Sequence, residues 1–226
     1  MSAAPSPAPS AIVVGAGPGI GLAVARRFAR EGYAVGLVAR RAETVRDAAA
    51  ALGGLGGGPV ATATADATDE TALRAALDSL TGALGTPHTV VYNAALIRPD
   101  AIGDLSLREH LDAWAVNVGG ALVTAAHLAP AMAERGSGSF LVTSGMPEAK
   151  PEYASLSLGK AGVRALVSLL DGTYGPAGVH AASIRVDGPV APGTAFDPDD
   201  IAAHYWRLHT EPRGRWTHEA VHSGDA

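Results

Sequence analysis

Residues 11–21 read Ala11-Ile-Val-Val-Gly15-Ala-Gly17-Pro-Gly19-Ile-Gly21, so an apolar run leads directly into a glycine-rich segment. Residues 11–15 have the length and the β-branched composition of a buried strand. In residues 20–31 the apolar positions recur at the spacing of one helix face. The stretch therefore predicts a strand, a tight glycine loop and a helix in immediate succession.

The glycine loop is suited to holding phosphate groups. Glycine lets the backbone turn tightly and approach a pyrophosphate, and the following helix N-terminus offers free N–H groups and the positive end of its dipole. Glycines at this spacing are a weak signal alone but a strong one between a strand and a helix. We therefore predict a dinucleotide site that includes Gly15, Gly17, Pro18, Gly19, Ile20 and Gly21.

Apolar runs of strand length alternate with helical patterns along the rest of the chain. Further strands are expected at residues 35–39, 60–64, 89–92, 139–143, 179–186 and 216–222. Further helices are expected at residues 41–52, 69–80, 106–132, 153–170 and 199–208. This alternation is typical of βαβ units, so we predict a single-domain α/β fold with a doubly wound parallel sheet of about seven strands.

Composition excludes several classes of protein. The 226 residues suit one domain with a sizeable core, and a formal net charge of −5 gives no basic surface for nucleic acid. The absence of cysteine excludes disulfides and thiolate catalysis. No apolar run approaches the roughly 18 residues of a membrane span, so no membrane partner is expected. Residues 1–10 are predicted to be a flexible tail before a domain at 11–226, and cytoplasm is the expected compartment.

The end of the second expected strand bears on the choice of cofactor. An acidic residue there would hydrogen-bond a ribose 2′-hydroxyl, whereas arginine accommodates a 2′-phosphate. Here Ala39 is followed by Arg40 and Arg41, with no acid beside them. The sequence therefore favours NADP(H) over NAD(H); the alternative is that both arginines are solvated cations at a helix start.

Several stretches, in the expected order, resemble the short-chain dehydrogenase/reductase superfamily. The glycine loop has the Gly-x3-Gly-x-Gly form of its main branch. The matching stretches are residues 15–21, 65–67, 92–95, 114–119, 142–145 and 159–163, and the resemblance covers about residues 11–222. It implies a Rossmann-like fold, NAD(P)-dependent oxidoreductase activity on a small-molecule substrate, and a homodimer or homotetramer.

The resemblance also implies further cofactor-binding residues. Asp66 and Ala67, after the third strand, would hold the adenine ring, although Asp66 could instead cap the third helix. Around residues 188–210 the family places its substrate lid, and the segment before the lid packs on the nicotinamide. The implied contacts with the adenine ribose and the nicotinamide are Asn93, Ala94, Ala95, Gly188, Pro189 and Val190.

Three residues match the family's catalytic set. Ser144 would face the substrate, Asn117 would hold a water of the proton relay, and Lys160 would reach the nicotinamide ribose hydroxyls. Each has a structural alternative: Ser144 as a loop cap, Asn117 bonded to backbone at a helix kink, and Lys160 as a snorkelling surface lysine. The family's proton donor is a tyrosine four residues before the lysine, and here that position is Leu156, which cannot donate.

Two routes around the missing phenol remain open. Tyr153 lies seven residues before Lys160, about 10 Å along a helix axis and on the same face. Tyr-x6-Lys resembles the enoyl-thioester reductase branch, which implies Tyr153 as the donor; the alternative is a tyrosine that only lines the pocket or caps the helix start. Alternatively, the substrate is an iminium that arrives already protonated.

The predicted function is therefore an NADP(H)-dependent oxidoreductase that reduces a small C=O, C=C or C=N substrate with a non-standard catalytic set. The alternative is a non-redox protein that binds a cofactor or another ligand on the same fold. No metal site is predicted, because the pairs His204/His209 and His218/His222 lack a convincing third ligand.

Overall fold

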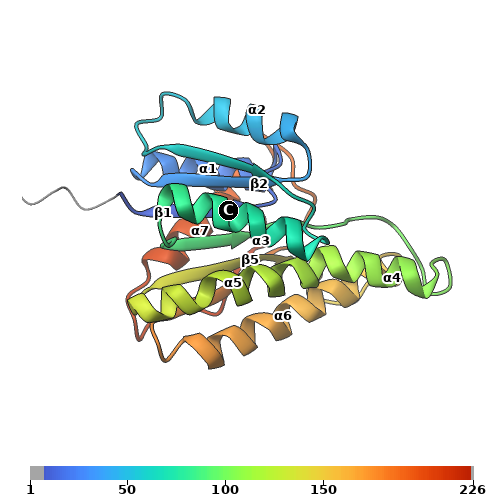
Figure 1. Cartoon of the computed structure of the whole chain (residues 1–226). Helices are drawn as coiled ribbons and strands as arrows, with labels where there is room; N and C mark the ends of the chain where they lie inside the picture. The colour runs from blue at the N-terminus through green and yellow to red at the C-terminus, as the bar shows by residue number, and fades with distance from the viewer. Residues whose placement is uncertain (1–7, 225–226) are drawn as a thin grey trace, which may run out of the picture.

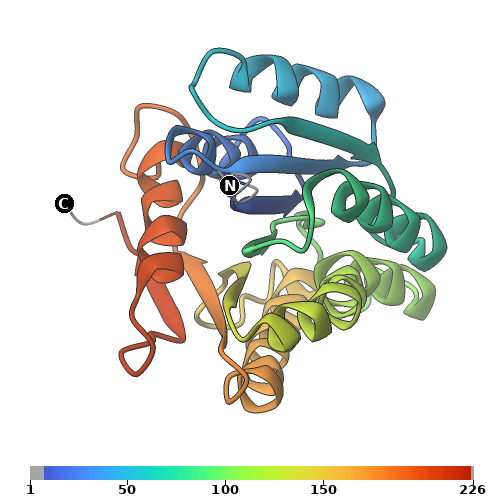
Figure 2. The same cartoon turned by 60° about the vertical axis from the view of Figure 1, so that its left-hand side comes forward.

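The computed structural model describes residues 8–224 of the chain. Most of the tail expected at residues 1–10 lies outside these described residues, and the first strand already begins at Ser10. Seven parallel strands form one sheet in the order β3-β2-β1-β4-β5-β6-β7 (Figures 1 and 2). They are β1 (Ser10–Val14), β2 (Ala34–Ala39), β3 (Val60–Thr64), β4 (Thr89–Tyr92), β5 (Gly138–Gly145), β6 (Val179–Val186) and β7 (Glu219–His222).

The helices cover both faces of the sheet, so the prediction of a doubly wound α/β fold is confirmed. One face carries α1 (Ile20–Arg30), α2 (Ala42–Leu52) and α7 (Pro198–Thr210). The other carries α3 (Glu70–Leu84), α5 (Gly120–Arg135) and α6 (Ala154–Tyr174), with α5 and α6 side by side (Figure 1). A short helix α4 (Leu107–Trp114) and a π-helical turn η1 (Ala115–Gly119) lead into α5.

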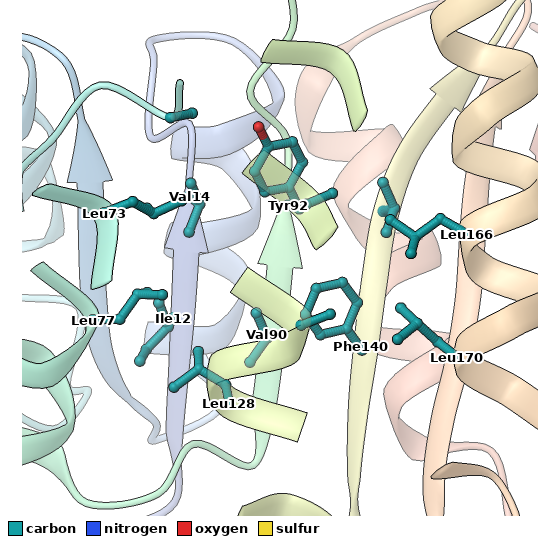
Figure 3. Close-up of a cluster of buried hydrophobic side chains, with 14 of the residues drawn as sticks. Ile12, Val14, Leu73, Leu77, Val90, Tyr92, Leu128, Phe140, Leu166 and Leu170 are labelled. Atoms are coloured by element: carbon teal, nitrogen blue, oxygen red, sulfur yellow. The ribbon is translucent and has the colours of Figure 1, made fainter. Parts of the chain in front are cut away.

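Alternating side chains of the central strands feed two separate cores. Ile12 and Val14 belong to the core under α3, α5 and α6, whereas Ala11 and Val13 belong to the core under α1 and α7. This follows from the two-residue period of a strand. Figure 3 shows the first core, in which neighbouring strands meet leucines from the covering helices. Full burial of each such side chain stabilises the fold by roughly 1.5–3 kcal/mol.

The sheet order reverses between β1 and β4, because the chain winds outward from β1 to β3 and then returns to the other side of β1. In open parallel sheets the ligand binds beyond the carboxyl ends of the strands at such a switch point. The loops that follow β1 and β4 are therefore the part of the fold where the predicted dinucleotide site belongs.

One continuous helical stretch, Leu107–Arg135, is long and apolar enough by length and composition to cross a membrane, with a mean hydropathy of 1.3 in its 18-residue window. Half of that window is buried inside the protein, where α5 packs on α3 and α6. The prediction that no apolar stretch reaches this length was therefore wrong as a statement about length and composition. A core helix against a sheet has the same composition, because its inner face must be apolar.

Candidate functional site

A cavity of about 410 Å³ opens at the switch point between β1 and β4. Its walls come from the loops that follow β1, β2, β3 and β4 and from the helical segment that contains Asp112 and Val116. The volume lies within the range usual for cofactor and small-molecule sites. The strand ends thus converge on one pocket, as the glycine loop predicted.

The loop after β1 is shaped by two glycines that accept no side chain. Gly15 has φ +94°, and a Cβ there would lie 2.4 Å from the backbone nitrogen of Ala94. A Cβ at Gly21 would lie 2.2 Å from the carbonyl oxygen of Gly15. The first turn of α1 is consequently pressed against the loop, which brings the helix N-terminus to the cavity edge.

Other positions of the loop face open space on the ligand side. A Cβ added at Gly17 or Gly19 would meet nothing within 4 Å, and no side chain caps the N-terminus of α1. Gly17 and Pro18 line the cavity, whereas Gly19, Ile20 and Gly21 are not part of its lining. Free N–H groups beside an open space fit the pyrophosphate of a dinucleotide.

Arg40 and Arg41 both line the cavity at the end of β2. Arg41 is the N-cap residue of α2, whose first turn receives no side-chain cap. Thr44, one turn into α2, lines the cavity beside them and was not predicted. Two guanidinium groups and an uncapped helix N-terminus make this wall attractive to an anion.

Asp66 and Ala67 line the cavity after β3, as expected. The backbone N–H of Thr68 is the main cause of a lowered pKa at Asp66, and the Thr68 hydroxyl and the charge of Arg40 act in the same direction. Asp66 does not cap α3; that role belongs to Asp69, whose carboxylate accepts from the N–H of Ala72. The capping alternative for Asp66 was therefore wrong.

Asn93, Ala94 and Ala95 line the cavity after β4. Asn93 also holds the glycine loop, because its Nδ2 donates to the Gly15 carbonyl at 2.9 Å. Its Oδ1 accepts from the Thr143 hydroxyl of β5 at 2.7 Å. The amide thus links the glycine loop to β5, the strand that contains Ser144.

Two of the expected catalytic residues, on β5 and α6, are buried outside the cavity lining. Ser144 is 4% exposed, and its Oγ has no hydrogen-bond partner among the residues that the structure describes. Lys160 is 6% exposed, and its Nζ donates to the Thr143 carbonyl at 2.8 Å. Burial lowers the pKa of Lys160 to about 8, so it is not the snorkelling surface lysine of the alternative reading.

Asn117 sits in the π-helical turn η1 and bonds to backbone. Its Oδ1 accepts from the Leu96 N–H at 2.9 Å, and its Nδ2 donates to the Leu96 carbonyl at 3.3 Å. The structural alternative for Asn117 therefore describes its contacts here. Single π-helical turns inside α-helices are frequent at functional sites.

Leu156 is buried on the first turn of α6, with 3% of its surface exposed. Tyr153 is the N-cap residue of the same helix, with φ −141° and ψ 51°. It precedes the helical residues, so the shared helical face expected for Tyr153 and Lys160 does not apply. No hydrogen bond within residues 8–224 involves the Tyr153 phenol.

The segment expected to cover the nicotinamide is an irregular strap between β6 and α7. Gly188 packs under Phe196, since a Cβ there would lie 2.2 Å from the ring. Pro189 and Val190 are exposed, and none of the three residues Gly188–Val190 lines the cavity. Within residues 8–224, no three His, Asp or Glu side chains are grouped as metal ligands.

Some lining residues had no sequence signal. Asp112 and Val116 reach the cavity from α4 and η1, far along the chain from the strand ends. Only the return of this helix over the switch point brings them there. Thr44, by contrast, could have been found from its helical spacing three residues after Arg41.

Comparison with known proteins points in one direction. The family model for short chain dehydrogenases matches residues 9–195. A glucose 1-dehydrogenase from Gluconobacter oxydans (strain 621H) is 31% identical over 194 residues, which are 84% of this chain and 71% of the relative. A cis-4-hydroxycyclohexanecarboxylate dehydrogenase from Sinomonas cyclohexanicum is 32% identical over 191 residues, 83% of this chain and 74% of the relative.

Solved structures share the whole fold. An alcohol dehydrogenase from the archaeon Thermococcus sibiricus, complexed with 5-hydroxy-NADP, has a TM-score of 0.84 at 26% identity, covering 94% of this chain and 95% of the other. A metagenomic short-chain oxidoreductase in complex with NADP has a TM-score of 0.86 at 24% identity, covering 95% and 96%. The likeness to the second, at this identity, concerns the fold alone.

Proposed function

The chain belongs to the short-chain dehydrogenase family, and on that premise we propose that it is an NADP(H)-dependent oxidoreductase that reduces a small C=O, C=C or C=N substrate with a non-standard catalytic set. The observation that carries the cofactor choice is the cavity wall after β2. Arg40 and Arg41 both line it, and no acid stands between Ala39 and Ala42 to bind a ribose 2′-hydroxyl.

The chain's own residues divide the work of binding along the cavity. The loop at Gly15–Pro18 and the N-terminus of α1 would hold the pyrophosphate, and Arg40 with Arg41 would hold the 2′-phosphate. Asp66–Ala67 and Asn93–Ala95 would line the adenosine, with Gly188–Val190 against the nicotinamide. The bound cofactor supplies the hydride.

The catalytic half is a site with one free hydroxyl and no aligned phenol. Ser144 has an unpartnered buried Oγ, which fits it to orient a substrate oxygen or nitrogen. Lys160 and Asn117 support this wall from α6 and η1. The source of the proton is open: Tyr153 from the start of α6, or a substrate that arrives as an iminium.

The direct test is a fluorescence titration with NADPH and NADH, followed by a substrate panel of ketones, enones and preformed cyclic imines. We expect submillimolar NADPH binding, weaker NADH binding, and turnover in one class of the panel. If Tyr153→Phe keeps full activity on that class, Tyr153 is not the donor. Failure of the wild-type chain to bind NADPH would falsify the proposal.

One observation favours a second candidate function, ligand binding without redox turnover. The cavity lining includes the residues proposed to hold the adenosine and the pyrophosphate. Ser144 and Lys160 are buried and do not line it. This candidate predicts NADPH binding with no turnover anywhere in the same panel. The substrate panel therefore distinguishes the two functions, whereas the NADPH titration does not.

The remaining proposals concern the assembly and its location. We place the protein in the cytoplasm as a homodimer or homotetramer acting on a small molecule. Exposed leucines on α4, α5 and α6 support the assembly, since exposed large apolar groups on neighbouring helices are typical of an interface.

A further inference from the structure

A chain of buried hydrogen bonds runs from α7 to the phosphate loop. The Tyr205 hydroxyl lies 2.6 Å from the Thr143 hydroxyl of β5. The Thr143 hydroxyl lies 2.7 Å from Oδ1 of Asn93, whose Nδ2 lies 2.9 Å from the Gly15 carbonyl oxygen. Three side chains from three different elements thus connect the centre of α7 to the first turn of the cofactor loop.

The direction of every bond in this chain is fixed. The carboxamide of Asn93 donates through Nδ2 to Gly15, so its Oδ1 must accept, and the donor is the Thr143 hydroxyl. That hydroxyl has a single hydrogen, so Tyr205 must donate to Thr143. Tyr205 is fully buried, and burial raises its pKa, which keeps the phenol in its donating form.

The end of the chain is the carbonyl that shapes the loop. Gly15 adopts φ +94°, and its oxygen is confined between the Asn93 amide and the backbone of Gly21. Thr143 also contacts Lys160, because its backbone carbonyl accepts a hydrogen bond from the Lys160 ammonium at 2.8 Å. Neither Thr143 nor Tyr205 lines the cavity, so the hydrogen bonds connect the loop to residues outside the cavity lining.

We propose that Tyr205 is a positioning residue for the dinucleotide loop, acting through Thr143 and Asn93 on the Gly15 carbonyl. The inference rests on the proposed dinucleotide binding. Tyr205→Phe removes the donor and leaves the Thr143 oxygen without it, in a chain whose bonds polarise one another. Because α7 packs on α1 and on the sheet, the hydrogen bonds join a core helix to the loop.

The experiment compares ligands that do and do not need the loop. Dissociation constants of NADPH, ADP and adenosine 2′-monophosphate are measured for wild type and Tyr205→Phe. We expect NADPH and ADP to bind roughly three- to tenfold more weakly, the loss of about one hydrogen bond. Adenosine 2′-monophosphate has no pyrophosphate, so its affinity should fall less than that of NADPH or ADP.

Two further variants and a matched control sharpen the result. Thr143→Val breaks the chain at its second link and should weaken NADPH binding to a similar extent, whereas Thr143→Ser keeps the hydroxyl and should restore it. Tyr33→Phe is the control, because the Tyr33 phenol also bonds to α7: it lies 2.7 Å from the His209 ring. Tyr33 directly precedes β2, so this contact lies at the amino ends of the strands, away from the glycine loop. It should leave all three dissociation constants unchanged.

Each outcome decides between defined readings. If wild type does not bind NADPH, the proposed function fails before this inference is reached. If wild type binds but Tyr205→Phe and Thr143→Val bind NADPH equally well, Tyr205 does not position the loop. An equal loss of adenosine 2′-monophosphate affinity would also overturn the inference, because the effect would then be global. Where Tyr205→Phe melts below the assay temperature, Thr143→Val against Thr143→Ser gives the decision.

Discussion

Leu156 occupies the first turn of α6, one turn before Lys160, and is almost wholly buried. In the catalytic site proposed around Ser144 and Lys160, an apolar side chain at this position supplies no acidic proton. Chemistry at this site then depends on a donor from elsewhere or on a substrate that already carries its proton. The departure from the family pattern is thus a buried, apolar residue in the fold.

Restoring the phenol tests this reading. In Leu156→Tyr we expect ketone reduction to appear or to rise at least tenfold, since positioned general acids contribute about 10²–10⁴-fold. The larger ring must also fit a packed place, so the free energy of unfolding should fall by roughly 1–3 kcal/mol. Steady-state NADPH oxidation and thermal unfolding measure the two effects.

Leu156→Phe is the control for the added ring. It should destabilise the fold to a similar degree and leave ketone reduction unchanged. Equal ketone activity in the two variants would show that the phenol hydroxyl has no role at this position.

Arg40 is the residue on which the proposed preference for NADP(H) depends most directly. In Arg40→Ala we expect the dissociation constant of NADPH to rise about tenfold, the range of a hydrogen bond to a charged group. That of NADH should change less than twofold, because NADH has no 2′-phosphate. Parallel fluorescence titrations measure both, and equal losses for the two cofactors would contradict the assignment.

At the scale of elements, apolar periodicity located the helices and strands, and capping and side-chain contacts fixed their ends. The third helix starts after Asp69 because that carboxylate caps it, and α4 starts after Ser106 through a reciprocal bond with Glu109. The last strand was expected from residue 216, but it begins at Glu219. The Trp216 ring instead stacks on His180, so it does not join the sheet.

Helix α7 is anchored near its C-terminal end by a half-buried histidine. His209 lies 2.6 Å from the Thr89 hydroxyl and 2.7 Å from those of Ser139 and Tyr33. Burial lowers its pKa to about 4, with the charge of Arg135 acting in the same direction. The neutral imidazole is therefore the form that holds this end of the helix.

This environment predicts a loss of stability in mild acid. In the unfolded chain His209 titrates near its ordinary pKa of about 6.5, so the unfolded state binds more protons between pH 6.5 and 4. The contribution of His209 to the free energy of unfolding should be fully present above pH 6.5. It should fall by on the order of 2 kcal/mol as the pH drops through that window. His209→Gln should flatten the dependence of the free energy of unfolding on pH, measured by urea denaturation at several pH values. An unchanged pH dependence would contradict the prediction.

At the scale of the whole molecule, exposed apolar side chains gather on α4, α5 and α6. Leu107, Leu111 and Trp114 share one face of α4, and Leu158 and Leu169 share one face of α6. These helices pack on one another along the same side of the sheet (Figure 1). A second copy covering this side would remove the leucines from water.

Light scattering after size exclusion tests the assembly. The wild-type chain should elute as a dimer or tetramer at micromolar concentration, and Leu111→Glu should shift it toward the monomer by placing a charge in an apolar contact. Val60→Glu, on the opposite outer strand, should leave the assembly unchanged. A monomeric wild-type chain, or equal effects of the two substitutions, would contradict this assignment of the interface.

The sequence by itself determined the parallel α/β fold and the family, because strand and helix periods and the glycine loop are local properties of consecutive residues. It also placed Arg40, Arg41, Asp66 and Asn93 at strand ends, which a parallel sheet brings to one edge. The extra lining residues Thr44, Asp112 and Val116 were not predicted from it.

Only the tertiary structure decided the contacts between segments far apart in the chain. It placed Asp112 and Val116 on the cavity, bonded Asn117 to Leu96, took Tyr153 out of the helix and buried Lys160 against β5. It also connected Tyr205 to the glycine loop through Thr143 and Asn93. The physical reason is that hydrogen bonds and burial depend on which surfaces meet when the helices pack on the sheet, and no local periodicity encodes that meeting.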